Sequence, residues 1–157
     1  MRPVHPENVG GTARSMMAFG CTNLILVEPK ADLRKAAGIA LQGSVIVDNA
    51  RIVSSLAEVR GRLYGLLSPK EITDHRTVGG PLSEGSKYSR KAFFLVVGGE
   101  DGMTPEESQL LERVFYIPTV EPYSVLNMAS AASIGLFALS QIPEKNELPL
   151  QLLACQA

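Results

Sequence analysis

The stretch AFFLVVGG, residues 92–99, indicates the fold class of this chain. Its apolar residues follow one another without the polar alternation of a half-buried strand, and two glycines end the run. Three further runs of this kind occur at 23–29 (NLILVEP), 62–68 (RLYGLLS) and 114–118 (VFYIP). Strands that are apolar throughout are typical of a parallel sheet that helices cover on both faces.

Helices are expected in the segments around these strands, over the ranges 11–20, 54–61, 104–114 and 124–142. The clearest start signal is Thr104 as N-cap, with Pro105 at the first helical position and Glu107 three residues after the cap. The strand and helix order predicts an α/β architecture with a parallel sheet flanked by helices.

The length of 157 residues suits a single domain, 1–157, that is large enough to bury a core. The segment 68–91 is polar and rich in Gly and Pro, so we expect one long loop there. Only four residues precede HPENVGG (5–11). A strand before this segment is therefore expected to be very short, or to be cut off by the start of the chain.

Composition excludes several classes of protein. No apolar run reaches the roughly 18 residues of a membrane span, and the first residues lack the apolar core of a signal peptide. Cys21 and Cys155 lie far apart, and His5 and His75 are isolated, so neither a metal site nor a disulfide framework is indicated. We expect a cytoplasmic protein that binds no metal and no membrane.

The charges are unevenly distributed along the chain. The formal net charge is -1, which is unlike the basic excess of a dedicated nucleic-acid-binding domain. Residues 58–91 nevertheless hold seven Lys and Arg against four acids, whereas 100–157 hold two against eight. The basic stretch fits either an ordinary solvated surface or a patch that faces an anion.

Four polar or glycine-rich segments follow an apolar strand or open the chain. They are HPENVGGTAR (5–14), LLSPK (66–70), VVGGEDGMTP (96–105) and YIPTVEPYSVLN (116–127). Ligands of parallel α/β sheets bind at the carboxyl ends of the strands, so we expect these segments to meet around a ligand. The glycine patterns of dinucleotide-binding and P-loop proteins are absent, as is the G-x-S-x-G motif of serine hydrolases.

Three stretches, taken in order, resemble the motifs of the SpoU/TrmH branch of the SPOUT RNA 2′-O-ribose methyltransferases. They are NVGGTARSMMAFG (8–20), VVGGEDGMTPEE (96–107) and IPTVEPYSVLNMASAASIGLFAL (117–139), and the resemblance runs from residue 5 to about 140. It implies the SPOUT fold with a C-terminal trefoil knot and S-adenosylmethionine (SAM) as cofactor. It also implies a homodimer in which catalytic residues of one subunit meet the cofactor of the other.

The resemblance implies specific site residues. The catalytic ones are Asn8, Arg14, Glu100, Ser124 and Asn127; the cofactor-binding ones are Leu67, Gly98, Gly99, Gly102, Ile117 and Leu126. Each polar residue taken alone also fits a structural role. Arg14 suits a solvated helix face, Asn8 and Ser124 suit helix caps, and Glu100 suits a surface ion pair. Between Glu100 and Gly102 the motif is one residue shorter than the family's usual pattern.

The implied activity is SAM-dependent methyl transfer to a ribose 2′-hydroxyl of RNA, with tRNA favoured as substrate. Since a guanidinium keeps its proton throughout the pH range in which proteins work, we expect Arg14 to orient the RNA phosphate and stabilise the forming alkoxide, while the phosphate or water accepts the proton. The alternatives are an rRNA 2′-O-methyltransferase, a SAM-dependent enzyme acting on protein, or a non-catalytic knotted protein for RNA binding or assembly.

Overall fold

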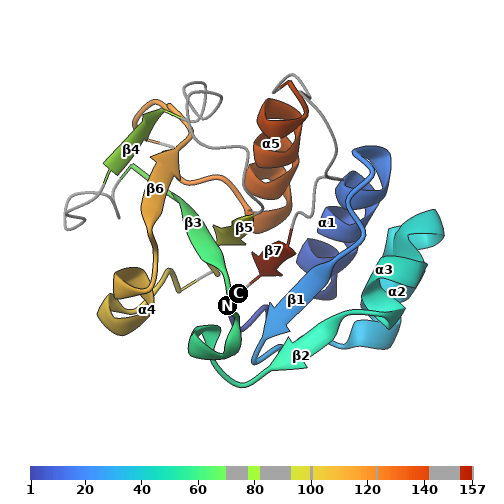
Figure 1. Cartoon of the computed structure of the whole chain (residues 1–157). Helices are drawn as coiled ribbons and strands as arrows, with labels where there is room; N and C mark the ends of the chain where they lie inside the picture. Colours follow the sequence, from blue (N-terminus) through green and yellow to red (C-terminus); the bar gives the residue numbers. More distant parts are fainter. Residues whose placement is uncertain (70–77, 82–92, 100, 123, 142–152, 157) are drawn as a thin grey trace.

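The computed structural model describes residues 1–69, 78–81, 93–99, 101–122, 124–141 and 153–156. Its strands form one parallel sheet in the order β2-β1-β7-β5-β3-β6-β4 (Figure 1). They are β1 (Leu24–Val27), β2 (Arg51–Val53), β3 (Arg62–Leu67), β4 (Val78–Pro81), β5 (Phe93–Val97), β6 (Arg113–Tyr116) and β7 (Leu153–Gln156).

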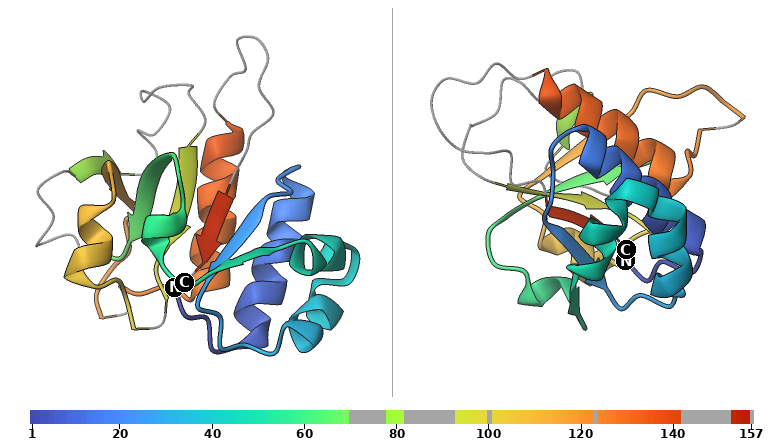
Figure 2. Two further views of the ribbon diagram at one scale, coloured as in Figure 1. Left: turned by 60° about the horizontal axis from the view of Figure 1, so that its bottom comes forward. Right: turned by 90° about the vertical axis from the view of Figure 1, so that its right-hand side faces the viewer.

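Helices cover both faces of the sheet (Figure 2). On one face lie α1 (Pro6–Ala18), α2 (Leu33–Ala40), α3 (Ser44–Asp48) and α5 (Met128–Ser140), with the 3-10 turn η1 (Leu41–Gly43) between α2 and α3. The other face carries α4 (Pro105–Gln109) and the 3-10 turn η2 (Leu56–Glu58).

The alternation of side chains along each strand divides the apolar core in two. In β1, Leu24 and Leu26 pack with the helices α1, α2, α3 and α5, while Ile25 and Val27 pack on the opposite face. In the same way Leu95 and Val97 of β5 face one core and Val96 faces the other. The apolar runs are therefore continuous because every strand position here has a buried face to fill.

Glycines set how closely α1 approaches its neighbours. A Cβ on Gly10 would lie 2.6 Å from the carbonyl oxygen of Ala36 in α2, and a Cβ on Gly43 would lie 2.8 Å from that of Ala13 in α1. On the other side of α1, the hydroxyls of Ser15 and Ser133 lie 2.6 Å apart, which joins α1 to α5. The spacing of these helices thus depends on positions without a side chain.

The structure confirms the predicted α/β class and the parallel sheet flanked by helices. The apolar runs at 23–29, 62–68, 92–99 and 114–118 each contain a strand. The predicted capping box is also present: Glu107 N–H donates to the Thr104 hydroxyl at 3.2 Å, and Thr104 N–H donates to the Glu107 carboxylate at 2.8 Å.

Several predicted bounds were wrong. The helix expected at 11–20 is α1, which begins at Pro6 because proline suits the first helical position, so HPENVGG is largely helical rather than a turn. The helix expected at 124–142 begins at Met128, after an extended segment. The helices expected at 54–61 and 104–114 shorten to η2 and α4.

Other elements were not predicted. The segments that become α2, α3, β2 and β7 were assigned no structure, and the expected loop at 68–91 contains β4. Residues 1–5 form neither helix nor strand, so they do not contain the very short strand expected before HPENVGG. The trefoil knot stays a prediction, because the chain path through 70–77, 82–92 and 142–152 lies outside the described residues.

Replacing Gly10 with Ala is expected to lower the free energy of unfolding by about 1–3 kcal/mol, since α1 and α2 would have to move apart. Gly38→Ala, in the same pair of helices, is the matched control because a Cβ there meets nothing within 4 Å. It should raise helix stability by up to about 1 kcal/mol. Denaturant unfolding of both variants measures the difference, and equal effects would contradict the close-packing argument.

Candidate active site

A pocket of about 670 Å³ lies at the carboxyl ends of β3, β5 and β6. Parallel strands bring these ends to one edge of the sheet, and the N-terminal turns of α1 and α5 complete the walls. The pocket is lined by His5, Glu7, Asn8, Leu66, Leu67, Ser68, Pro69, Val97, Gly98, Gly99, Ile117, Thr119, Ser124, Val125, Leu126, Asn127, Met128 and Ala131.

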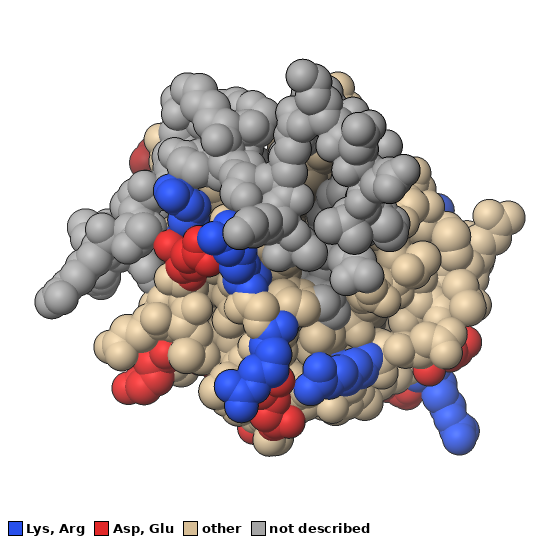
Figure 3. All heavy atoms as spheres, in the orientation of Figure 1, with Lys and Arg blue, Asp and Glu red and all other residues tan. Residues whose placement is uncertain are grey.

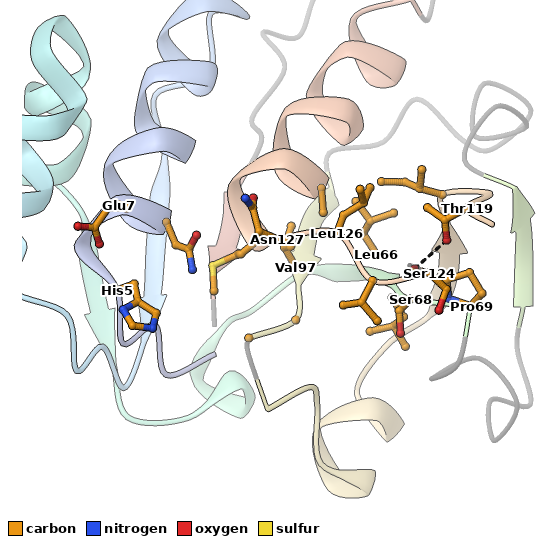
Figure 4. A pocket seen from close by; sticks show the side chains of 18 residues that line it. His5, Glu7, Leu66, Ser68, Pro69, Val97, Thr119, Ser124, Leu126 and Asn127 are labelled. Carbon is orange, nitrogen blue, oxygen red and sulfur yellow. Dashed lines mark hydrogen bonds between the residues drawn. The ribbon is translucent and has the colours of Figure 1, made fainter. Parts of the chain in front are cut away.

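The two ends of this pocket differ in chemistry (Figure 4). His5 and Glu7 lie at one end, beside α1, with Asn127 of α5 between them and the rest. Leu66, Val97 and Leu126 gather toward the other end, with Ser68, Pro69, Thr119 and Ser124 beyond them. One end can therefore hold an ionic or strongly polar group, and the other can bury an apolar or aromatic one.

The structure brings most of the predicted site residues to this pocket. Asn8, Ser124 and Asn127 line it, as do five of the six predicted cofactor residues: Leu67, Gly98, Gly99, Ile117 and Leu126. Arg14 does not line it and is exposed on α1. Glu100 lies outside the described residues.

Gly102, the sixth predicted cofactor residue, closes a turn next to the pocket instead of lining it. Gly102 N–H donates to the Gly99 carbonyl at 3.1 Å, and Gly102 has φ +71°, in the left-handed region that glycine adopts without strain. The shortened second motif is therefore compatible with a closed turn directly after β5.

The segment before α5 presents a buried hydroxyl to the pocket. Ser124 is 4% exposed, and its hydroxyl has no hydrogen-bond partner among the described residues. Its carbonyl accepts a hydrogen bond from the Thr119 hydroxyl at 2.7 Å, which holds the segment in place (Figure 4). A buried polar atom without a protein partner is often one that a ligand satisfies.

The residues that cap α1 and α5 are His5 and Asn127, and not Asn8 and Ser124. Asn127 caps α5, because its side chain accepts from Ser130 N–H at 2.8 Å. His5 is the N-cap residue of α1, with no side-chain cap hydrogen bond, so Asn8 belongs to the first turn of that helix. Asn127 thus has a structural role as well as a place in the pocket wall.

Sequence reasoning missed two residues of the polar end, His5 and Glu7. Both were present in the quoted motif, but an isolated histidine and a first-turn glutamate are common in proteins without a site. The only signal available was their position, within three residues of Asn8.

Comparison with known proteins gives the family. The model of the SpoU rRNA Methylase family matches residues 1–137. The chain belongs to the SpoU methylase family.

One relative and two solved structures show how similar this chain is to individual known proteins. The tRNA (cytidine/uridine-2′-O-)-methyltransferase TrmJ of Yersinia enterocolitica is 32% identical over 94% of this chain and 65% of its own length. A probable methylase family protein from Haemophilus influenzae has a TM-score of 0.78 at 28% identity, over 90% of this chain and 61% of the other. The SpoU methyltransferase AviRb of Streptomyces viridochromogenes, solved with AdoMet, has a TM-score of 0.70 at 24% identity, over 89% and 57%.

This SpoU chain spans 54% to 69% of the length of the first curated relatives that it matches. The likeness to AviRb establishes the fold, and its cofactor is a property of that protein. In the described part of the chain, no helix is long and apolar enough to cross a membrane, and no cluster of His, Cys, Asp and Glu suits a metal ion.

An ion pair lies beside the turn that follows β5. The Arg2 guanidinium donates to both carboxylate oxygens of Glu107, at 2.7 and 3.3 Å, and lies 3.7 Å from Glu28. Only 24% of the Arg2 side chain and 14% of the Glu107 side chain are exposed. Burial raises the pKa of Glu107, but the hydrogen bonds from Arg2 and Thr104 outweigh it and hold the pKa below the ordinary value of 4.5.

Of the cations in the basic stretch at 58–91, the structure describes Arg60 and Arg62, and neither of them lines the pocket. Arg60 and Arg62 precede or begin β3, whereas the pocket lies at its carboxyl end, about 20 Å along a strand of that length. Arg62 pairs with Glu112 at 3.4 Å. Figure 3 shows the Lys and Arg side chains of the described residues on this face interleaved with Asp and Glu.

Acid should lower the free energy of unfolding of this protein partly by protonating the Glu107 carboxylate. Because the folded-state pKa lies below the ordinary value, the stabilisation is complete above pH 4.5 and is lost as the pH falls through the lower folded value. Glu107→Gln keeps the capping box but not the charge. Denaturant unfolding between pH 7 and pH 3 should therefore show a steeper loss of stability for the unaltered protein than for this variant. Parallel curves would contradict the assignment.

Proposed function

We propose that this chain is a subunit of a SAM-dependent RNA 2′-O-ribose methyltransferase. The observation that carries the proposal is the pocket itself: an apolar end, a glycine turn and an unpartnered buried hydroxyl lie next to a polar end, at the carboxyl edge of a parallel sheet. Membership of the SpoU family supports the same activity.

The pocket residues fit SAM. Leu67, Ile117 and Leu126 offer an apolar surface for the adenine ring, and Gly98 and Gly99 leave their backbone groups accessible. The unpartnered Ser124 hydroxyl can bond a polar group of the cofactor or of the acceptor ribose. When bound, SAM supplies an electrophilic methyl group on its sulfonium.

The polar end fits the acceptor nucleotide. The N-termini of α1 and α5 both border the pocket. The partial positive charge at the N-terminus of α5 favours an anion such as a phosphate, whereas at α1 the Glu7 carboxylate opposes one. Asn8 and Asn127 carry amide groups that can hold a ribose hydroxyl. The contribution of these residues to rate is chiefly to position the nucleophile.

Arg14 is proposed to act on the site of a partner subunit. It is exposed on α1 and does not line the pocket of its own chain. α1 and α5 lie side by side and expose Met17, Ile134 and Phe137, which are apolar residues that a second subunit can cover. In a homodimer formed on this surface, Arg14 would clamp the RNA phosphate at the other pocket.

tRNA is the proposed substrate class, because the relative from Yersinia enterocolitica carries a tRNA 2′-O-methyltransferase name. The description of the matching family model, which names rRNA, favours rRNA as the second candidate.

Calorimetric titration with SAM and with S-adenosylhomocysteine tests cofactor binding. We expect saturable binding to the unaltered protein and none to Leu126→Trp, since the larger side chain fills the apolar end. Ile52→Trp is the matched control, because Ile52 is 58% exposed on β2, away from the pocket, and should leave binding unchanged. A folded protein that binds neither compound would exclude the methyltransferase proposal.

A subunit-mixing experiment tests whether Arg14 acts across the dimer. Arg14→Ala and Leu126→Trp should each be inactive in tRNA methylation. When equal amounts of the two variants exchange subunits at random, about half of the dimers contain one subunit of each variant. Each of these mixed dimers has one complete site out of two, so about a quarter of the activity of the unaltered protein should return. No recovery, despite exchange shown by differently tagged subunits, would mean that Arg14 works within its own chain.

A further inference from the structure

We propose that the Arg2–Glu107 ion pair positions two walls of the cofactor pocket relative to each other. One wall is the segment that leads into α1, and the other is the glycine turn that follows β5. This inference rests on the proposed function and adds a positioning pair from outside the pocket lining.

The chain around Arg2 connects the ion pair to the first wall. Arg2 N–H donates to the Val27 carbonyl at 2.8 Å, and the Pro3 carbonyl accepts from Lys30 and Ala31 N–H at 2.9 and 2.7 Å. This short segment is thereby fixed against the end of β1. His5, two residues after Pro3, begins the stretch that lines the polar end of the pocket.

Glu107 connects the same ion pair to the second wall. Its carboxylate accepts from Thr104 N–H at 2.8 Å as well as from Arg2, so it holds the residue at which the glycine turn passes into α4. The turn itself is closed by the Gly102 to Gly99 hydrogen bond, and Gly99 lines the pocket. Arg2 lies three positions before His5, and Thr104, which Glu107 holds, lies five positions after Gly99.

The geometry of Arg2 indicates that its position is strongly determined. Its φ is +59°, a left-handed conformation that costs a non-glycine residue roughly 1–2 kcal/mol. Such conformations persist where surrounding contacts over-determine them. Here the guanidinium faces Glu107 and Glu28, the hydrogen bond to Glu107 raises its pKa, and Asp101 also contributes. A two-pronged pair of this kind fixes orientation as well as distance.

The test is calorimetric titration of Arg2→Met, Glu107→Gln and the double variant with S-adenosylhomocysteine. Each single variant should bind about three- to tenfold more weakly, in the range by which residues outside a site change its affinity. The double variant should be no weaker than the weaker single one, because the pair acts as a unit. Arg2→Lys keeps the positive charge but not the two-pronged hydrogen bonding, so its affinity should lie between those of the unaltered protein and Arg2→Met.

A matched ion pair at the opposite edge of the sheet provides the control. Arg62 and Glu112 lie 3.4 Å apart, and Arg62→Met with Glu112→Gln should leave the affinity within twofold of the unaltered protein, or about 0.4 kcal/mol. A variant that is destabilised but still folded binds with unchanged affinity, so thermal unfolding of each variant separates positioning from stability.

The outcomes are distinct. If the unaltered protein binds S-adenosylhomocysteine, and Arg2→Met and Glu107→Gln bind it with the same affinity, the positioning role is overturned and the proposed function is left intact. Additive losses in the double variant would overturn the pair as a unit. Absence of binding by the unaltered protein would overturn the methyltransferase proposal and this inference with it.

Discussion

The parallel pairing of strands that are buried on both faces is the constraint on which the rest of this structure depends. Because all neighbouring strands run the same way, the segments after β3, β5 and β6 emerge at one edge of the sheet. Helices on both faces then leave this edge as the place where polar and glycine-rich segments can gather. The pocket therefore follows from the sheet topology, and its chemistry follows from the side chains that the segments carry.

Close packing on one face sets the spacing of the helices that border this edge. α1 lies close to α2 at Gly10 and to η1 at Gly43, and the Ser15 and Ser133 hydroxyls join it to α5, so these contacts fix the two helices that border the pocket relative to each other. On the other face the short helix α4 has little buried surface of its own, and its position depends on the capping box and on the Arg2 guanidinium. The two faces thus stabilise the site by different means, one apolar and one ionic.

The strands could be predicted from the sequence because burial on both faces leaves an unbroken apolar run, as at 92–99. β4 has the sequence VGGP and β2 has only three residues, so neither gives such a run. The capping box marked the start of α4 but could not mark its end, because Arg113 is required in β6 after only a short helix. Local signals identify starts and apolar faces, whereas helix length is decided by the distance that the chain has to cover.

Some residues of the candidate site could be predicted from the sequence, and others could not. Motif resemblance led to Asn8, Ser124 and Asn127, which line the pocket, and to Arg14, which does not. Apart from the family resemblance, a sequence gives no sign of whether a residue faces its own site or a neighbour's, because that depends on packing between chains. His5 and Glu7 carried no signal of their own, and Arg2 was outside every motif, so their places beside the pocket emerge only from the folded arrangement.

The central place of β7 has a consequence for how this protein is made. β7 lies between β1 and β5, and Gln156 pairs with Leu26 on one side and Val97 on the other. During synthesis from the N-terminus, the β1–β2 half and the β5–β3–β6–β4 half remain without a common strand until residues 153–156 have left the ribosome. Contacts this distant in sequence close slowly. A nascent chain of this kind exposes two unpaired strand edges until residues 153–156 pair with both of them, and edges of this kind can pair with other chains.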